Sequence, residues 1–208
     1  MVKYLYLQSQ KENKMAGRPK IYDEEAVLDK AIGVFWEKGY ENASADDLLK
    51  AMGIGKGSFY FAFKGGKQEL FEKSMKRVAD QYFRDFRKAV MSCENPVQLI
   101  REFFFSLAGA ESPVGERGCY FGNALVQISE SDAGLKTVAA ESLGLLESIF
   151  QEAMVRGKEL GLLKSSYEPA LLATYLINLW NGFNVTKRMV TDPEKRLALM
   201  KMNLEPIQ

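Results

Sequence analysis

The sequence predicts an all-α protein, and three observations support this fold class. Apolar residues recur at helical spacing in successive segments, glycines and prolines stand near the ends of those segments, and no run alternates in the pattern of a half-buried strand. The chain has 208 residues, of which 47% are hydrophobic and 26% charged. We therefore expect a soluble globular protein with room for a small domain joined to a larger one.

The first predicted helix covers residues 24–38. Acidic residues at 23–25 lie where the helix dipole favours them, and Gly39 is placed to end the helix. One helical face collects the apolar side chains of Val27, Leu28, Ala31, Ile32, Phe35 and Trp36.

Two shorter helices follow, over 44–52 and 56–62. Ser44 and Asp47 have the spacing of a capping box, so they mark the start of the second helix. Gly53 marks its end. After residue 66 the pattern is helical throughout, and the breaks at prolines and glycines predict six further helices, near 67–91, 96–109, 118–130, 133–160, 167–189 and 193–203.

Composition excludes several classes of function. The chain contains no histidine, which removes Ser-His-Asp and Cys-His catalysis and most zinc chemistry. Its two cysteines, Cys93 and Cys119, suit a reducing cytoplasm and cannot form a four-cysteine zinc site. We therefore predict no catalytic residues, no metal site and no cofactor. The apolar stretch at 169–180 is too short to cross a bilayer, and residues 1–10 make a poor signal peptide, so we expect a cytoplasmic protein without membrane contact.

Charge is spread unevenly. Residues 1–92 contain 17 Lys and Arg against 13 Asp and Glu, whereas residues 93–208 contain 11 against 14. This asymmetry suggests an anionic partner for the N-terminal half. Lysines also cluster in a window free of acidic residues, at Lys50, Lys56, Lys64 and Lys67, although such clusters are commonly just solvated surface.

The segment AMGIGKGSFYFAFKGGK at 51–67 combines glycine with lysine, as phosphate-binding loops do. A dinucleotide fingerprint needs a preceding strand, and a P-loop needs GxxxxGK followed by Ser or Thr. Here the preceding residues form a short helix and the spacing differs, which argues against a nucleotide site. Two short helices joined at Gly53 instead predict a helix-turn-helix, whose second helix enters the major groove of DNA. A helical corner without DNA binding is the plainer alternative.

Within that second helix the side chains divide by role. Phe59 and Phe63 lie four residues apart and are expected to pack inward, whereas Tyr60 lies on another face with its hydroxyl free to reach a phosphate. The first turn, Lys-Gly-Ser at 56–58, offers an ammonium, a hydroxyl and closely approachable backbone N–H groups, all suited to phosphates.

Residues 31–71, AIGVFWEKGYENASADDLLKAMGIGKGSFYFAFKGGKQELF, resemble the DNA-binding domain of the tetracycline-repressor (TetR) family. The marks are F-x-x-x-G-Y at 35–40, Ser44, the core GIGKGSFY at 53–60, Phe63, and Lys67 before Leu-Phe. One departure is F-K-G-G-K at 63–67, a residue longer than the F-x-S-K common in the family, which puts the role of Lys67 in doubt. The match is dense over about 50 residues, and the helical remainder has the length that the family expects.

The resemblance implies a set of DNA contacts. Phosphate contacts fall to Ser44, Lys56, Ser58, Tyr60 and Lys67, with Gly57 allowing close backbone approach. Base contacts are expected from Gly55 and Lys56, and from Phe61 or Ala62 against thymine methyls. Arg18, beside Pro19 in a flexible basic arm over 1–20, is expected to reach an adjacent minor groove. Met15 offers a second start, so residues 1–14 are a candidate extension.

The predicted architecture is therefore an N-terminal three-helix helix-turn-helix domain, residues 21–66, and a C-terminal six-helix ligand-binding and dimerisation domain, residues 67–208. The last two helices resemble the dimerising pair of the family, with ordinary core packing as the alternative. A homodimer would read the two halves of a palindromic double-stranded DNA operator.

Segments 101–109 and 117–132 mix aromatic and polar residues, as small-molecule pockets do. Asn123 and Gln127 lie on one helical face and, if buried, need partners that a ligand can supply. For each candidate, plain core packing is the alternative. The predicted effector-binding residues are Phe104, Cys119, Tyr120, Phe121, Asn123, Gln127, Trp180 and Asn184.

The stretch R-G-C-x-x-G-N at 117–123 resembles a TetR subgroup in which the cysteine senses electrophiles or oxidants. Cys119 is the matching residue, and its expected place at a helix N-terminus would lower its thiol pKa. Three hypotheses follow: a repressor released by a small apolar or aromatic effector; a repressor that senses through Cys119; and, less favoured, an all-α carrier or enzyme without DNA binding.

Overall fold

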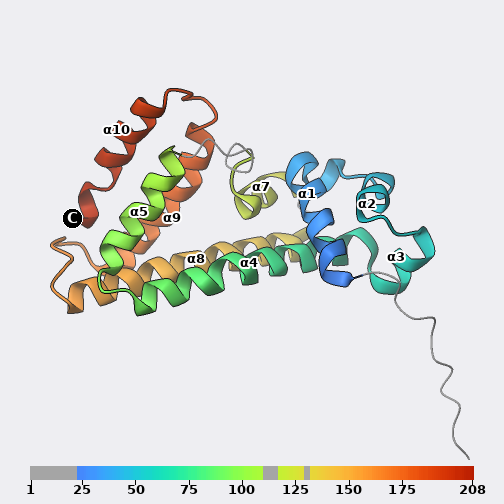
Figure 1. Ribbon diagram of the computed structural model, residues 1–208, viewed down its shortest axis with the longest axis horizontal. Coiled ribbons are helices and arrows are strands. Elements are labelled where there is room, and N and C mark those ends of the chain that lie inside the picture. The colour runs from blue at the N-terminus through green and yellow to red at the C-terminus, as the bar shows by residue number, and fades with distance from the viewer. Residues whose placement is uncertain (1–22, 110–116, 129–131) are drawn as a thin grey trace, which may run out of the picture.

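The computed structural model describes residues 23–109, 117–128 and 132–208, and in these residues every regular element is helical (Figure 1). This confirms the predicted all-α fold. The predicted basic arm, residues 1–20 with Arg18, lies outside the described residues. The elements are α1 (Glu24–Asn42), α2 (Ala45–Met52), α3 (Lys56–Ala62), α4 (Gly66–Ser92), α5 (Pro96–Gly109), α7 (Tyr120–Gln127), α8 (Ala133–Glu159), α9 (Pro169–Thr186), α10 (Pro193–Asn203) and the short 3-10 helix η2 (Glu205–Ile207). No described helix is long and apolar enough to cross a membrane.

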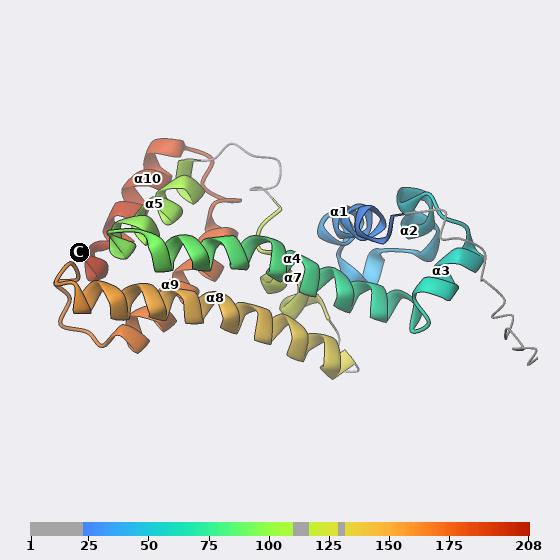
Figure 2. The same cartoon turned by 60° about the horizontal axis from the view of Figure 1, so that its bottom comes forward.

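The long helices α4 and α8, 27 residues each, lie side by side along the molecule (Figures 1 and 2). Helices α1, α2 and α3 gather at one end of α4, and α5, α9 and α10 gather around its other end. Helix α7 lies between these two groups and packs against α1 and α8. The molecule therefore has a small N-terminal helical unit and a larger helical body, joined by one continuous helix.

Local capping explains where the helices of the N-terminal unit begin and end. Helix α1 is interrupted at Gly39, which has a non-helical backbone (φ 77°, ψ 168°). The capping box predicted at the start of α2 is present: the Asp47 backbone N–H donates to Ser44 Oγ at 3.1 Å, and the Ser44 N–H donates to Asp47 Oδ2 at 3.3 Å. Gly53 ends α2 in the left-handed conformation (φ 69°), which a glycine adopts without strain.

Two predicted helices are longer than the observed ones. The helix expected over 118–130 is only Tyr120–Gln127, because Gly118 has φ 75° and Cys119 is an extended N-cap residue. The helix expected over 167–189 is Pro169–Thr186, beginning directly at its proline.

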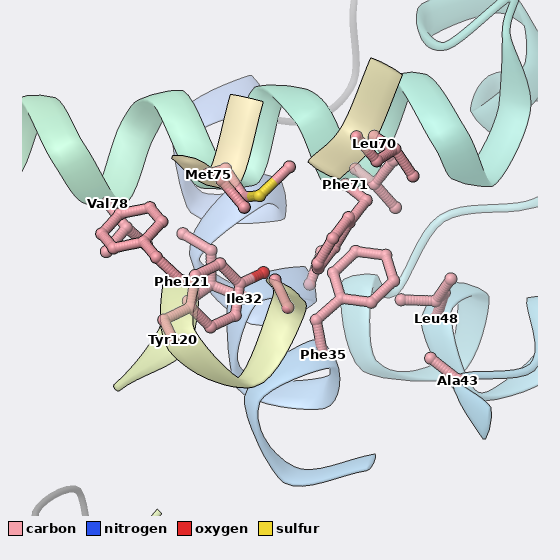
Figure 3. Packing of buried hydrophobic residues seen from close by; sticks show 14 of the residues in the cluster. Ile32, Phe35, Ala43, Leu48, Leu70, Phe71, Met75, Val78, Tyr120 and Phe121 are labelled. Carbon is pink, nitrogen blue, oxygen red and sulfur yellow. The ribbon is translucent and has the colours of Figure 1, made fainter. Parts of the chain in front are cut away.

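Two hydrophobic clusters form the core. The first joins α1, α2, α3 and the start of α4 with α7 and α8, and Figure 3 shows Tyr120 and Phe121 of α7 among the side chains of α1 and α4. The ring of Phe35 in α1 meets that of Phe71 in α4 edge-on, with centroids 4.7 Å apart. The second cluster joins α5, α8, α9 and α10. The start of α4 therefore completes the core of the N-terminal unit, across the boundary predicted at residues 66 and 67.

Candidate DNA-binding surface and effector cavity

Helix α3 presents one buried and one open face. Phe59 and Phe63 are buried, 4% and 0% exposed, which confirms that they pack inward. Tyr60 and Phe61 are 50% and 73% exposed, so α3 carries aromatic side chains on its outer surface. Its first turn contains no acidic residue, and Lys56 is exposed. This outer face has the charge and exposure that a phosphate-contacting helix requires.

Two glycines at the start of α3 have no steric role inside the chain. A Cβ built at Gly55 or Gly57 would meet no atom within 4 Å, and both have φ values that other residues adopt. Their missing side chains are therefore relevant only to something that approaches from outside. Ser58 is exposed on the same turn.

Two predicted phosphate ligands are engaged elsewhere. The Ser44 hydroxyl donates to Asp47 Oδ2 at 2.7 Å, and the Lys38 ammonium lies 2.6 Å from Asp47 Oδ1. The hydrogen bonds from Lys38 and Ser44 lower the pKa of Asp47 to about 2. Lys67 Nζ donates to the carbonyl of Glu41 at 3.1 Å and lies 4.7 Å from the centroid of the Tyr40 ring. Both side chains hold the unit together in this structure, and their DNA contacts stay predictions.

A cavity of about 380 Å³ lies where the N-terminal unit meets the helical body. Half of its lining residues are aromatic, and they come from α1, α4, α5, α7, α8 and α9. The lining residues are Trp36, Val78, Tyr82, Phe83, Phe86, Phe103, Ser106, Leu107, Gly118, Cys119, Tyr120, Phe121, Leu146, Trp180, Asn184 and Lys187. This size and composition are those of small-molecule sites. Five predicted effector residues are in the wall: Cys119, Tyr120, Phe121, Trp180 and Asn184.

Three other predicted effector residues lie outside the cavity. Phe104 is 0% exposed and packs against Phe150, with ring centroids 5.6 Å apart, so it is a core residue. Asn123 turns away and donates through Nδ2 to the carbonyl of Arg117 at 2.8 Å. Gln127 is exposed, and its amide covers Gly39 so closely that a Cβ there would have no room. The shared face of Asn123 and Gln127 thus braces the loop before α7 and the end of α1.

Sequence reasoning missed Trp36, Phe103 and Lys187. Trp36 was assigned only to an apolar helix face, and Lys187, the C-cap residue of α9, was not selected because lysine side chains are usually exposed. The Trp36 indole Nε1 donates to the carbonyl of Gly118 at 3.1 Å, which ties α1 to the loop before α7. The guanidinium of Arg188 also donates to the carbonyl of Arg117 in that loop.

Cys119 is the N-cap of α7, as expected, and its Sγ accepts a hydrogen bond from the Gly122 N–H at 3.3 Å. The predicted direction of its pKa shift is nevertheless wrong. Burial raises the pKa of the Cys119 thiol, and this effect outweighs the Gly122 N–H, the Trp180 indole and the charge of Lys187, which all favour the thiolate. The neutral thiol is therefore favoured.

The same apolar surroundings shift the pKa of Lys187 in the opposite direction, downward. Burial, followed by the nearby charge of Arg188, lowers the pKa of Lys187 to about 8, against a small opposing effect of the Cys119 thiol. The cavity wall thus contains an amine and a thiol that both favour their neutral forms more than they would in water.

Comparison with known proteins accounts for both parts of the chain. The family model for bacterial regulatory proteins of the tetR family matches residues 27–73, and the model for a tetracyclin repressor-like C-terminal domain matches residues 98–202. The HTH-type transcriptional repressor ComR of Escherichia coli K12 is 25% identical over 188 residues, 89% of either chain. The uncharacterized HTH-type transcriptional regulator YezE of Bacillus subtilis 168 is 32% identical over 166 residues, 77% of this chain and 83% of YezE.

Solved structures agree. A cysteine mutant of the TetR family transcriptional regulator CifR, complexed with double-strand operator DNA, superposes with a TM-score of 0.78 at 27% identity, covering 90% of this chain and 98% of CifR. The two family models together cover the helix-turn-helix and the helices from α5 to α9. The chain belongs to the TetR family of bacterial regulatory proteins.

Proposed function

We propose that the protein is a homodimeric transcriptional repressor that binds a palindromic operator through α3 and leaves it when a small molecule occupies the cavity. The observation that carries DNA binding is the outer face of α3. Its Lys56 and Tyr60 are exposed, and Gly55 and Gly57 leave open backbone that nothing in the chain fills. Backbone N–H groups and an ammonium at a helix N-terminus are phosphate ligands.

DNA binding is tested by titrating duplex DNA from the protein's own upstream region and following fluorescence anisotropy over a series of salt concentrations. We expect affinity to fall steeply as salt rises, because phosphate contacts release counterions. A scrambled duplex of equal length gives the non-specific affinity. Equal affinity for the two duplexes would mean that the upstream region contains no operator. The absence of any binding at low salt would contradict the proposed DNA binding.

The proposed dimer surface is the outer face of α9. This helix, Pro169–Thr186, contains no charged residue although one side of it is exposed. That side carries Leu171, Thr174, Asn178, Gly182 and Val185, with Leu171 and Val185 58% and 61% exposed. An uncharged exposed helix face is typical of an interface between subunits. Two helix-turn-helix units brought together in this way would read two half-sites.

The cavity supports the effector. Trp36, in α1 of the helix-turn-helix unit, forms part of its wall, so a molecule in the cavity contacts the DNA-binding unit directly. Release requires that the molecule bind the DNA-free conformation more tightly than the DNA-bound one. The measurement that tests this is operator affinity with and without a saturating concentration of the cavity ligand, and we expect the ligand to lower it.

A second mode of sensing uses Cys119 as a thiol, and its place in the cavity wall at the N-cap of α7 favours it. The raised pKa of this thiol argues for slow reaction. Mass spectrometry after a short exposure to N-ethylmaleimide tests it, with half-buried Cys93 as the internal reference. Thiol sensing requires Cys119 to react faster than Cys93, and slower reaction would contradict it.

A further inference from the structure

Lys187 is a buried cation in the cavity wall without an anionic partner. The residue is 9% exposed, and its ammonium makes no hydrogen bond or ion pair with another described residue. The ionisable groups close enough to affect it are Arg188, Arg196 and the Cys119 thiol. Two of these are cations, and the third favours its neutral form, so the described surroundings supply no negative charge.

Such an arrangement disfavours folding. Burying an ammonium without a carboxylate costs free energy, which the lowered pKa of Lys187 reflects. Two neighbouring donors, Trp180 Nε1 and Arg196 Nε, are also buried without a hydrogen-bond partner, although the indole is close enough to Cys119 to favour its thiolate. We call these groups the seat: two cations besides Lys187, two unpaired N–H donors and one unpaired acceptor, Asn181 Oδ1, so that its surplus of positive charge fits an anion.

The position of these groups relates the seat to the cavity. Trp180, Asn184 and Lys187 are spaced by four and three residues, so they share one face of α9 and its continuation, and all three line the cavity. The rest of the wall is mostly apolar. The ring of Phe103 stacks on Phe86 at 4.7 Å and on Trp180 at 5.3 Å between centroids, which leaves flat aromatic surface for a hydrocarbon body.

We propose that the cavity binds an amphipathic carboxylic acid, with its carboxylate at Lys187 and Trp180 Nε1 and its apolar body against Phe86 and Phe103. The assignment rests on the proposed function for its regulatory meaning, but the binding itself does not. A neutral apolar molecule would fill the same volume and leave the charge of Lys187 unmatched. An acid would satisfy the ammonium and the indole N–H together.

The test compares acids with their uncharged equivalents. Phenylacetate, 4-phenylbutyrate and 6-phenylhexanoate are titrated at pH 7 beside the three corresponding primary amides, which have nearly the same shape and no charge. Trp36 and Trp180 are the only two tryptophans of the chain, and both line the cavity, so intrinsic fluorescence reports its occupancy. Calorimetry provides an independent affinity.

We expect at least one acid to bind on the order of tenfold more tightly than its amide, as charge-assisted hydrogen bonds provide. Lys187→Met should abolish this preference and leave amide binding unchanged, and Lys187→Arg should restore it. The matched control is Lys195→Met, at an exposed position of α10, which should keep the preference of the wild type. Circular dichroism and thermal melts verify that each variant is folded.

Two outcomes would overturn the proposal: no acid in the series binds better than its amide, or the preference survives in folded Lys187→Met. If Lys187→Met does not fold, the acid–amide comparison on the wild type decides by itself. Anisotropy with operator DNA is measured on the same samples. An acid preference without DNA binding contradicts the proposed function alone, and DNA binding without an acid preference contradicts this inference alone.

Discussion

The indole Nε1 of Trp36 donates a hydrogen bond to the carbonyl oxygen of Gly118, 3.1 Å away. The two residues are 82 positions apart in the chain and belong to the DNA-binding unit and to the loop before α7. The Trp36 ring also lies 5.3 Å from the ring of Tyr120, between centroids. One side chain therefore contacts the cavity, α7 and the helix-turn-helix unit at once.

Trp36→Phe should weaken the coupling between cavity and DNA. The phenyl ring keeps much of the packing on Tyr120 but cannot donate to Gly118. We expect operator affinity without ligand to change little. The ratio of operator affinities with and without a cavity ligand should fall roughly two- to tenfold, the range of one hydrogen bond. Tyr82→Phe, at another cavity residue, is the control. An unchanged ratio in Trp36→Phe would show that the bond carries no coupling.

Gly57→Ala should separate stability from DNA binding. The added Cβ meets nothing within the chain, and alanine is the better helix former, so the free energy of unfolding should rise by about 0.5–1 kcal/mol. Operator affinity should nevertheless fall, because the methyl group would lie where we propose that a DNA phosphate approaches. Gly33→Ala in α1, another helical glycine with open space, should stabilise the fold without this loss. Equal operator affinities for the two variants would contradict a close approach of DNA to the backbone at Gly57.

Lys56→Ala should change how DNA binding depends on salt. An ammonium that contacts one phosphate contributes about 0.9 to the slope of log affinity against log salt, so a dimer losing two such contacts should show a slope shallower by about 2. The thermal midpoint should not change, since Lys56 is exposed. Lys201→Ala, exposed on α10, is the reference. A slope identical to that of the reference would place Lys56 off the phosphates.

Val185→Glu should dissociate the dimer. Val185 is 61% exposed on the uncharged face of α9, so a glutamate there leaves the monomer folded. In a two-fold interface on this face each subunit would bury the new charge, which should weaken association by tenfold or more, on the order of 1–2 kcal/mol. Analytical ultracentrifugation measures this. Val126→Glu, at the 86% exposed Val126 of α7, provides the matched substitution, and equal dissociation of both would place the interface elsewhere.

Lys187→Met should stabilise the protein in a pH-dependent way. The pKa of Lys187 is about 8 when folded and near its ordinary value of 10.5 when unfolded. Between these values the unfolded chain binds more protons, so the stability of the wild type gains as pH rises through this window. The variant lacks this titration. We expect it to be more stable by up to about 3 kcal/mol below pH 8, and the advantage to vanish towards pH 10.5.

Urea unfolding at a series of pH values measures this difference, which also cancels the titration of the buried tyrosines present in both proteins. A constant advantage across the range would mean that Lys187 titrates as it does in water.

The sequence predicted best what neighbouring residues decide. The bounds of α2 and α3 agree with expectation to within a residue, and for α2 the reason is local capping by Ser44, Asp47 and Gly53. The start of α7 was placed too early, since the positive φ of Gly118 depends on a loop held by Trp36 and Arg188 from distant segments. Local pattern contains no information about such tethers.

The cavity shows the same limit. Aromatic composition identified Tyr120, Phe121 and Trp180, yet it also selected Phe104, because a core face and a cavity face have the same spacing in the sequence. The sign of the Cys119 pKa shift was missed for a related reason. A helix N-terminus can be read from the sequence, but the depth of burial that outweighs it cannot.

Helix α4 extends unbroken from the core beneath α3 to the core around α5 and α8. Its 27 residues correspond to about 40 Å at 1.5 Å per residue. The helix can act as a lever: from Phe83 in the cavity wall to Gly66 at its N-terminal end is about 25 Å, so a tilt of about 5° at the cavity moves that end by roughly 2 Å. Two such levers in a dimer would alter the distance between recognition helices by more than a phosphate contact tolerates, so very small rearrangements around a ligand would be enough to release the protein from DNA.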